Sequence, residues 1–235
     1  MKYMQSKEEE YFPDIANSTI MGNYLTKKEQ ELINAILEKE QLNDSFLLDI
    51  GGGSGRFAIP LSKKINVFVL ESSANALHIL KRKQEDIPIC RGDGEKLPFK
   101  ANIFDFVIVI EVLEHIVNKE DFLEECNKVL KEEGLLIITM SNKLSYKMLH
   151  PNRKKRRNFY WTTHNKFKKL LRLKGFNPEN SFGFNWIPAN RQSNNILIPY
   201  YAELENLFML KYLPFISPWV IISARKKSKL RLCKK

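Results

Sequence analysis

Residues 46–140 alternate between short apolar runs and stretches with the periodicity of a helix. The apolar runs cover residues 46–50, 67–70, 87–90, 104–110 and 135–140, and the helical stretches lie near residues 56–64, 74–83 and 119–131. Strands that are apolar almost throughout are buried on both faces, and parallel strands need crossover connections between them. The pattern therefore predicts an α/β fold whose mostly parallel sheet is covered by helices on both faces.

The first apolar run ends in a glycine-rich turn. In LLDIGGGSGRF, residues 47–57, Gly51, Gly53 and Gly55 form a G-x-G-x-G spacing, and a helical stretch follows at once. Glycine adopts positive φ without strain and lets the backbone approach a ligand closely. The spacing differs from the G-x-G-x-x-G of dinucleotide-binding folds, and the lysine of a P-loop is absent. Because ligands bind at the carboxyl ends of the strands in such sheets, we expect a nucleotide-like cofactor here; the alternative is a tight turn without a ligand.

Acidic residues follow the next three apolar runs. Glu71 ends the second run, where a carboxylate can accept hydrogen bonds from two ribose hydroxyls; the alternative is an acid that favours a helix N-terminus. Asp93 follows the third run and could accept from an adenine amino group, although Asp-Gly is also a common turn. Glu111 ends the fourth run. We expect these side chains at the same edge of the sheet as the glycine turn.

Five segments, taken in order, resemble the motifs of class I S-adenosylmethionine-dependent methyltransferases. They are LLDIGGGSGRFAIPL, the acid Glu71, GDGEKLPF, FDFVIVIEVLEHI and VLKEEGLLIITMSN, and the match covers roughly residues 46–142. The chain is most similar to the small-molecule branch, which includes the methyltransferases of quinone biosynthesis. The resemblance implies a Rossmann-like sheet of seven strands with an antiparallel last strand. It also implies S-adenosylmethionine as the cofactor and S-adenosylhomocysteine as its product.

The resemblance assigns nine cofactor contacts by position. They are Asp49, Gly51, Gly53 and Gly55 for the methionine part, Glu71 and Ser72 for the ribose, Asp93 and Gly94 for the adenine, and Glu111 near the sulfonium.

A catalytic residue is harder to assign, because methyl transfer from a sulfonium can proceed mainly by positioning of the reactants. His115 is the best candidate for a general base, since it follows the fourth run; the alternative is a helix-face histidine with a structural hydrogen bond. His150 and His164 could also line the substrate side. Tyr24 and Trp161 could close over the cleft.

A divalent metal is an alternative that we do not favour. If residues 111–115 form a helix, Glu111, Glu114 and His115 share one face, and with His164 they could bind magnesium or manganese. The same string is common in metal-free members of the family, so we expect no metal.

The chain after the fourth run argues against two classes of acceptor. No N/D-P-P-Y/F sequence follows residue 110, which disfavours amide and exocyclic amino nitrogens, and no Pro-Cys pair follows, which disfavours attack on cytosine C5. We therefore expect methyl transfer to oxygen or carbon of a small molecule. An RNA methyltransferase is an alternative, because the net charge is +11 and the basic residues 153–157 adjoin three aromatic residues. A catalytically silent, cofactor-binding partner protein is another.

We expect one methyltransferase domain over residues 1–235. It would comprise an N-terminal helical segment (1–45), a cofactor-binding core (46–142), a cap on the substrate side (143–218) and a basic tail (225–235). Helical periodicity is clear in Leu32, Ile33 and Ile36 of the first segment and in THNKFKKLLRLKGF, residues 163–176, where Gly175 would end the helix. Residues 177–195 are predicted to be loop-rich, residues 200–212 helical and residues 219–224 a strand.

The remaining features bear on location. The three cysteines are far apart, the N-terminus has no apolar core, and no run approaches the ~20 apolar residues of a membrane span. We therefore expect a cytoplasmic protein without a transmembrane segment. Peripheral membrane contact is an alternative for residues 204–215, which are rich in apolar residues and precede the basic tail. A core helix is the favoured interpretation of this segment.

Overall fold

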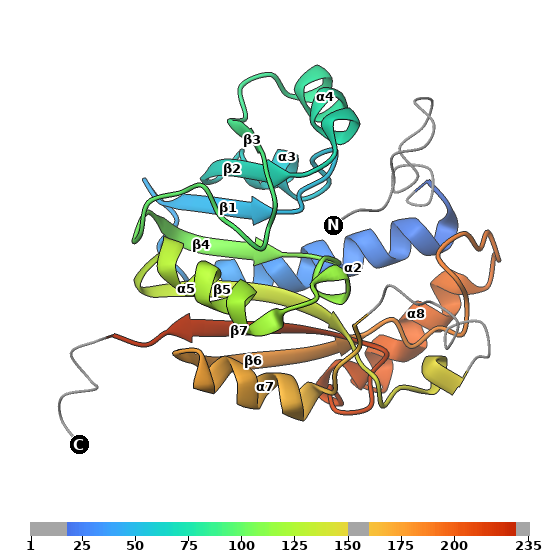
Figure 1. Cartoon of the computed structure of the whole chain (residues 1–235). Coiled ribbons are helices and arrows are strands. Elements are labelled where there is room, and N and C mark those ends of the chain that lie inside the picture. Colours follow the sequence, from blue (N-terminus) through green and yellow to red (C-terminus); the bar gives the residue numbers. More distant parts are fainter. Residues whose placement is uncertain (1–17, 150–159, 229–235) are drawn as a thin grey trace.

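The central sheet has seven strands in the order β3-β2-β1-β4-β5-β7-β6 in the computed structural model, which describes residues 18–149 and 160–228 (Figure 1). The strands are β1 (Phe46–Ile50), β2 (Asn66–Glu71), β3 (Ile89–Arg91), β4 (Phe104–Val109), β5 (Leu130–Ser141), β6 (Phe176–Phe184) and β7 (Trp219–Lys226). The first five pair in parallel, and β7 runs antiparallel between β5 and β6. The predicted Rossmann-like sheet with an antiparallel last strand is confirmed.

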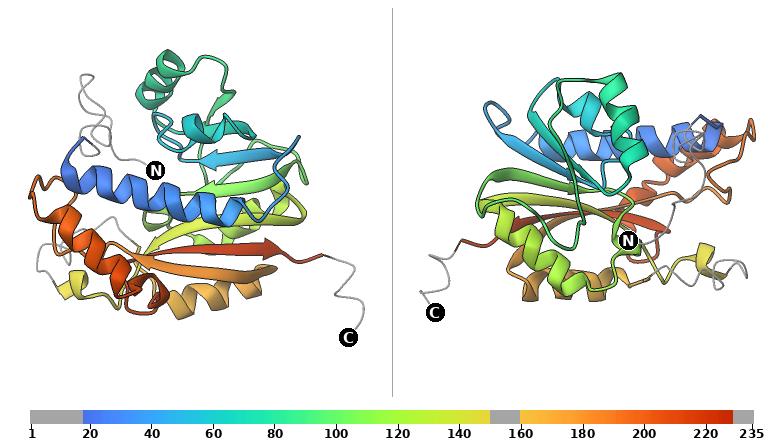
Figure 2. Two further views of the ribbon diagram at one scale, coloured as in Figure 1. Left: turned by 180° about the vertical axis from the view of Figure 1, so that it is seen from behind. Right: turned by 45° about the horizontal axis from the view of Figure 1, so that its top comes forward.

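Helices cover both faces of this sheet (Figure 2). One face packs against α2 (Ile20–Leu37), α3 (Ala58–Leu61), α4 (Ala74–Lys83) and α8 (Ile198–Leu207). The other face packs against α5 (Lys119–Val129) and α7 (His164–Leu173). Short 3-10 turns are η1 (Leu113–His115), η2 (Tyr146–Leu149) and η3 (Leu210–Tyr212).

The strands supply side chains to both hydrophobic layers in alternation. Leu47 packs with α2 and its neighbour Leu48 packs with α5, and Ile137 and Ile138 divide in the same way. Successive side chains of a strand point to opposite faces, so a strand between two helical layers must be apolar at nearly every position. This explains why these strands appear in the sequence as continuous apolar runs.

The helices begin where the sequence offers a capping side chain. The Ser73 hydroxyl accepts from the N–H of Ala76 at the start of α4, and the Asn118 side chain accepts from two N–H groups in the first turn of α5. Gly175 follows α7 with φ +82°, which confirms the predicted glycine at the end of that helix.

The expectation of loop-rich chain over residues 177–195 is wrong for its first half. Residues 176–184 form β6, the edge strand beside β7, with a register shift between Pro178 and Asn180. Proline and glycine weaken the sequence signal of a strand, but an edge position tolerates both because one side makes no ladder hydrogen bonds. Since α7 and β6 belong to the layers of the main fold, only other parts of residues 143–218 are available to form a cap.

The boundary of the predicted basic tail also needs correction. β7 extends to Lys226, so Arg225 and Lys226 belong to the sheet. Lys226 is 5% exposed, and its ammonium donates to the Leu130 carbonyl over 2.7 Å. A long aliphatic stem can be buried while its head group is satisfied by hydrogen bonds, which a charge pattern alone does not reveal.

Some predictions fall outside the described residues. They concern residues 1–17, His150, the basic run 153–157 and residues 229–235. Within residues 18–149 and 160–228, no helix has the length and apolar content needed to cross a membrane.

Candidate active site

The glycine turn follows the carboxyl end of β1 and contacts both β2 and α4. Gly51, Gly53 and Gly55 have φ values of +73°, +56° and +92°. A Cβ atom at Gly55 would lie 2.4 Å from Cδ1 of Leu80, so a larger residue would be both strained and in collision. The turn therefore needs glycine for its positive φ values, as the sequence predicted, and at Gly55 also for its packing.

Backbone hydrogen bonds join the ends of the first three strands. The N–H of Gly51 donates to the Leu70 carbonyl over 2.7 Å, and the N–H of Gly92 donates to the Glu71 carbonyl over 3.1 Å. In the loop after β3, Gly94 is buried, and a Cβ there would lie 3.1 Å from Ile50. Asp93 is exposed, and its carboxylate accepts from the N–H of Glu95. The predicted residues of these three loops are thus brought to one edge of the sheet.

The Glu71 carboxylate links the glycine turn to the start of α4. One oxygen accepts from the N–H of Gly53 over 3.1 Å, and the other accepts from the N–H of Ser73 over 2.8 Å and from the Ser72 hydroxyl over 3.1 Å. The contact with Ser73 is the role at a helix N-terminus that the sequence left open. Glu71 is 6% exposed, and Asp49 lies against the same turn, since a Cβ at Gly52 would be 2.8 Å from its Oδ2.

Asp49, in β1, is a buried acid beside the glycine turn. It is 1% exposed, and its Oδ2 atom has no hydrogen-bond partner among the described residues. Burial raises the pKa of Asp49 to about 7; Arg56 opposes this shift and Glu71 adds to it. An unsatisfied buried carboxylate is costly, so this position is suited to a ligand that brings a cation or a hydrogen-bond donor.

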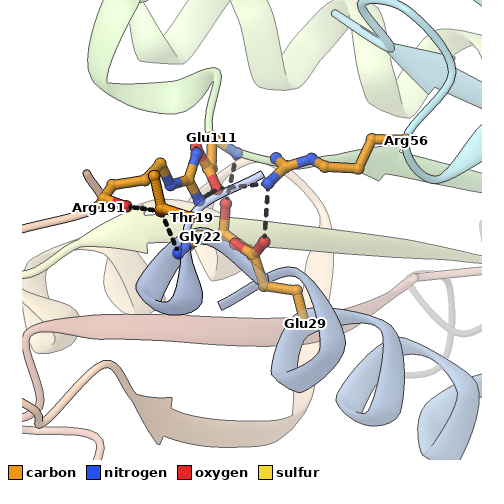
Figure 3. Close-up of polar contacts among 7 residues, drawn as sticks. Thr19, Gly22, Glu29, Arg56, Glu111 and Arg191 are labelled. Carbon is orange, nitrogen blue, oxygen red and sulfur yellow. Dashed lines mark hydrogen bonds and ion pairs between the residues drawn. The ribbon is translucent and has the colours of Figure 1, made fainter. Parts of the chain in front are cut away.

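Glu111, just beyond the end of β4, is the centre of a partly buried ion cluster (Figure 3). Its carboxylate accepts from Arg56 over 3.0 Å and from both terminal nitrogens of Arg191. Arg56 also pairs with Glu29 of α2 over 3.3 Å. Although burial acts to raise the pKa of Glu111, the two guanidinium groups hold it below its ordinary value. Burial raises the pKa of Glu29, and the nearby Glu111 carboxylate adds to this.

The partners of Glu111 were not predicted from the sequence. Arg56 adjoins the glycine motif, but nothing in the pattern pairs it with an acid. Glu29 carries a recognisable signal, because it lies at helical spacing from Leu25, Leu32 and Ile33 and is therefore a charge on the apolar stripe of α2. A charge on such a stripe must find a partner inside the protein.

The segment that carries Arg191 is bound to the first turn of α2. The Thr19 hydroxyl donates to the Arg191 carbonyl and accepts from the N–H of Gly22 (Figure 3). The N–H of Met21 donates to the Ser193 carbonyl over 3.0 Å. These contacts fix the backbone of Arg191 where its guanidinium can reach Glu111. The loop that carries Arg191 therefore lies beside the end of β4, although it is far away in the sequence.

An open groove runs between α2 and the glycine turn. Its volume is about 410 Å³, and its walls include Asn23 and Gln30 of α2 together with Ser54, Gly55 and Arg56. This size is within the range of small-molecule sites.

A family model described as a methyltransferase domain matches residues 48–138, the part of the chain that contains the glycine turn and the ends of β1 to β4. The chain carries a class I S-adenosylmethionine-dependent methyltransferase domain. S-adenosylmethionine is the methyl donor of this class.

Relatives of the methyltransferase domain include characterised and uncharacterised proteins. An uncharacterised protein of Methanocaldococcus jannaschii is 38% identical over 137 residues, which are 58% of each chain. A demethylmenaquinone methyltransferase of Thermotoga maritima is 29% identical over 145 residues, 60% of this chain and 59% of that protein. The alignments thus span less than two thirds of these relatives.

Solved structures share the fold of the methyltransferase. A putative sarcosine dimethylglycine methyltransferase from Galdieria sulphuraria superposes with a TM-score of 0.65 at 18% identity, covering 85% of this chain and 86% of that one. The complex of the Haloferax volcanii Trm112 methyltransferase activator with a putative methyltransferase contains a chain that superposes with a TM-score of 0.64 at 15% identity, covering 94% of this chain and 99% of that one.

The predicted catalytic and lid residues of the methyltransferase domain come from different elements of the fold. His115 is exposed in η1. Tyr24 donates to Glu205 of α8, and Trp161 is half-buried. His164 is buried at the start of α7; neither ring nitrogen has a partner in the described part of the chain, and burial lowers the pKa of its imidazole to about 4.

The alternative metal site is not assembled. Residues 111–115 do not form an α-helix, since only Leu113–His115 makes a 3-10 turn, and the Glu111 carboxylate is bound by two arginines. Glu114 is buried, and burial raises its pKa to about 7. In residues 18–149 and 160–228, no group of three His, Cys, Asp or Glu side chains is placed to hold a metal ion.

Proposed function

We propose that this protein transfers a methyl group from S-adenosylmethionine to oxygen or carbon of a small molecule, within a single domain. The observation that carries the proposal is the buried Oδ2 atom of Asp49, which has no partner among the described residues, beside a glycine turn that is hydrogen-bonded to Glu71, in a methyltransferase domain.

The residues at the strand ends fit the cofactor. The positive φ values of the glycine turn expose backbone for close approach, and Asp49 has an unused acceptor inside the part of the fold that the structure describes. We assign Asp49 and the three glycines to the methionine part, Glu71 and Ser72 to the ribose, and Asp93 and Gly94 to the adenine. Glu111 would lie nearest the sulfonium, where its carboxylate is fixed by Arg56 and Arg191.

Catalysis by this chain would rest on orientation. When bound, S-adenosylmethionine supplies a methyl group on a positively charged sulfur, which is a good leaving group. The glycine turn and the acids would fix the donor, and the Arg191 segment would help to exclude water and align the acceptor; such alignment is worth ~7–11 kcal/mol in favourable cases. We keep His115 as the candidate base for an acceptor that begins protonated.

The relatives support a small acceptor. Besides the demethylmenaquinone methyltransferase, a ubiquinone/menaquinone biosynthesis C-methyltransferase of Blochmanniella pennsylvanica is 33% identical over 114 residues, 45% of its length. The reduced, quinol form of such a ring has hydroxyl oxygens and an electron-rich ring carbon that can accept a methyl group and lose a proton, and neither acceptor atom needs a thiolate nucleophile in the enzyme.

Labelled S-adenosylmethionine and a cellular extract test the proposal directly. The chain should transfer the labelled methyl group to a small, organic-soluble product that RNase does not affect, and the Glu71→Ala variant should transfer less. RNase-sensitive label would indicate an RNA methyltransferase instead. Binding of S-adenosylhomocysteine without transfer to any fraction would indicate a silent partner protein.

A further inference from the structure

Helix α8 is turned with its apolar face toward solvent. Leu197, Tyr200, Tyr201, Leu207 and Phe208 recur at helical spacing and are 50%, 59%, 41%, 73% and 66% exposed. The adjacent side of the helix, which packs against the protein, buries Ile198 and Glu205, which are 1% and 4% exposed. A helix on the surface of a water-soluble domain normally has the reverse arrangement.

Specific polar contacts fix this orientation. The Tyr24 hydroxyl donates to Glu205, and the Lys28 ammonium donates to the Asn206 side chain over 2.5 Å; both donors lie on α2. Rotating α8 to bury its apolar face would break the hydrogen bond between Tyr24 and Glu205. The outward apolar face is therefore built into the packing of α8 on α2.

The exposed apolar surface continues beyond the helix. Met209 has φ +51°, an unusual value for a residue other than glycine, and it turns the chain into η3, where Tyr212, Phe215 and Ile216 are exposed. Ten of the sixteen large apolar side chains that are exposed in the described part of the chain lie in residues 196–216. We call the exposed residues of α8 and this turn the α8 strip.

The position of the α8 strip and the net charge of the whole chain restrict what could cover the strip. α8 lies beside α2 at the end of the sheet where the parallel strands terminate (Figure 1, Figure 2). Within residues 196–216, all of which are described, Glu203 is the single exposed acid, and Lys211 adds a positive charge beside Tyr212. The whole chain has a net charge of +11. A second copy would carry the same charge and be repelled, whereas an anionic surface would be attracted.

We propose that the α8 strip docks the protein on anionic lipid bilayers. Tyrosine side chains suit the boundary between lipid and water because each has an apolar ring and a polar tip. Leu207, Phe208 and Met209 would insert more deeply, among the acyl chains. The positive charge of the chain supplies the long-range attraction to acidic head groups.

Vesicle co-sedimentation of the full chain tests this docking. Wild-type protein should sediment with phosphatidylcholine vesicles that contain phosphatidylserine, less with pure phosphatidylcholine, and less in high salt. The double variant Leu207→Ser, Phe208→Ser should bind the anionic vesicles at least about tenfold more weakly, because two apolar side chains no longer insert. The matched control Val117→Ser, Leu173→Ser removes side chains that are 61% and 71% exposed elsewhere and should bind as wild type.

Three results would overturn the proposal. The first is wild-type protein that does not sediment with anionic vesicles. The second is a double variant that binds these vesicles as well as wild type and has an unchanged thermal midpoint. Either result would show that the strip does not bind lipid. Light scattering that shows a dimer for wild type and a monomer for the double variant would assign the strip to contact between copies of this chain instead.

Discussion

Glu71 combines two tasks that the sequence presented as alternatives. Its carboxylate accepts from Gly53, Ser72 and Ser73, so it shapes the glycine turn and the start of α4. A ribose would meet a carboxylate whose position is fixed by three donors. Such pre-organisation lowers the entropic cost of binding.

Replacing Glu71 with alanine should weaken binding of S-adenosylhomocysteine. The expected loss is roughly 1.5–3 kcal/mol, the range for hydrogen bonds to charged groups. Calorimetry measures it, with Glu71→Gln as a size-matched control that keeps part of the hydrogen bonding. Unchanged affinity in a folded alanine variant would remove Glu71 from the site.

Asp49 should make the ligand-free protein less stable as the pH rises. Its pKa is raised by burial to about 7 from an ordinary value of 3.8, so the folded state binds its proton more tightly than the unfolded state. The associated stability is complete below the ordinary pKa and is lost as the pH rises through the folded value. Between about pH 5 and pH 8 the loss should be roughly 1–3 kcal/mol.

Urea unfolding of wild type and Asp49→Asn at several pH values checks this expectation. The asparagine variant lacks the titrating group, so its stability should change less over the same pH range, and the difference between the two curves isolates Asp49 from Glu114. Parallel curves would show that Asp49 is ionised throughout this range.

Arg191 joins its own loop to two other parts of the fold, because its backbone contacts the N-cap of α2 and its side chain pairs with Glu111 in the loop after β4. The ion cluster has two carboxylates and two guanidinium groups, so its formal charges cancel. Removing one member of a buried cluster leaves its partner short of hydrogen bonds, which costs more than the pair contributes.

The variant Arg191→Ala should therefore be less stable by about 1–3 kcal/mol, and adding Glu111→Gln should restore part of the loss. A double-mutant cycle in urea measures the coupling between the two side chains. Additive effects of the two substitutions would show that the contact in Figure 3 contributes nothing to stability.

The elements differ in how well their sequences predicted them. The central strands were recognisable because burial on both faces requires apolar residues at nearly every position. The edge strand β6 was not, because one side faces water and Pro178 and Gly183 resemble turn residues. At the site, the glycine turn and Glu71 were predictable from local spacing, whereas Arg191 meets Glu111 only through tertiary structure, 80 residues apart.

Across the complete fold, α2 is continuous with the core. Its side chains pack in one hydrophobic layer with residues from β1, β4, β5 and β7 and with Ile187 and Ile198 from the C-terminal half. Arg225 of β7 adds a polar link by pairing with Glu40, just after α2, and with Glu179 of β6. A layer shared in this way predicts that the N-terminal helix and the C-terminal strands unfold together.

Replacing Ile33 with alanine tests this cooperativity. Ile33 is 1% exposed on α2, so the substitution should cost about 2–5 kcal/mol. All three tryptophans, Trp161, Trp186 and Trp219, lie in the C-terminal half. Their fluorescence and the far-ultraviolet circular dichroism should therefore shift to lower urea by the same amount, although the mutation is distant in sequence from every tryptophan. The exposed Glu31→Gln on the same helix should shift neither signal. A fluorescence midpoint that stays in place while the dichroism midpoint falls would mean that α2 and the C-terminal strands are separate cooperative units.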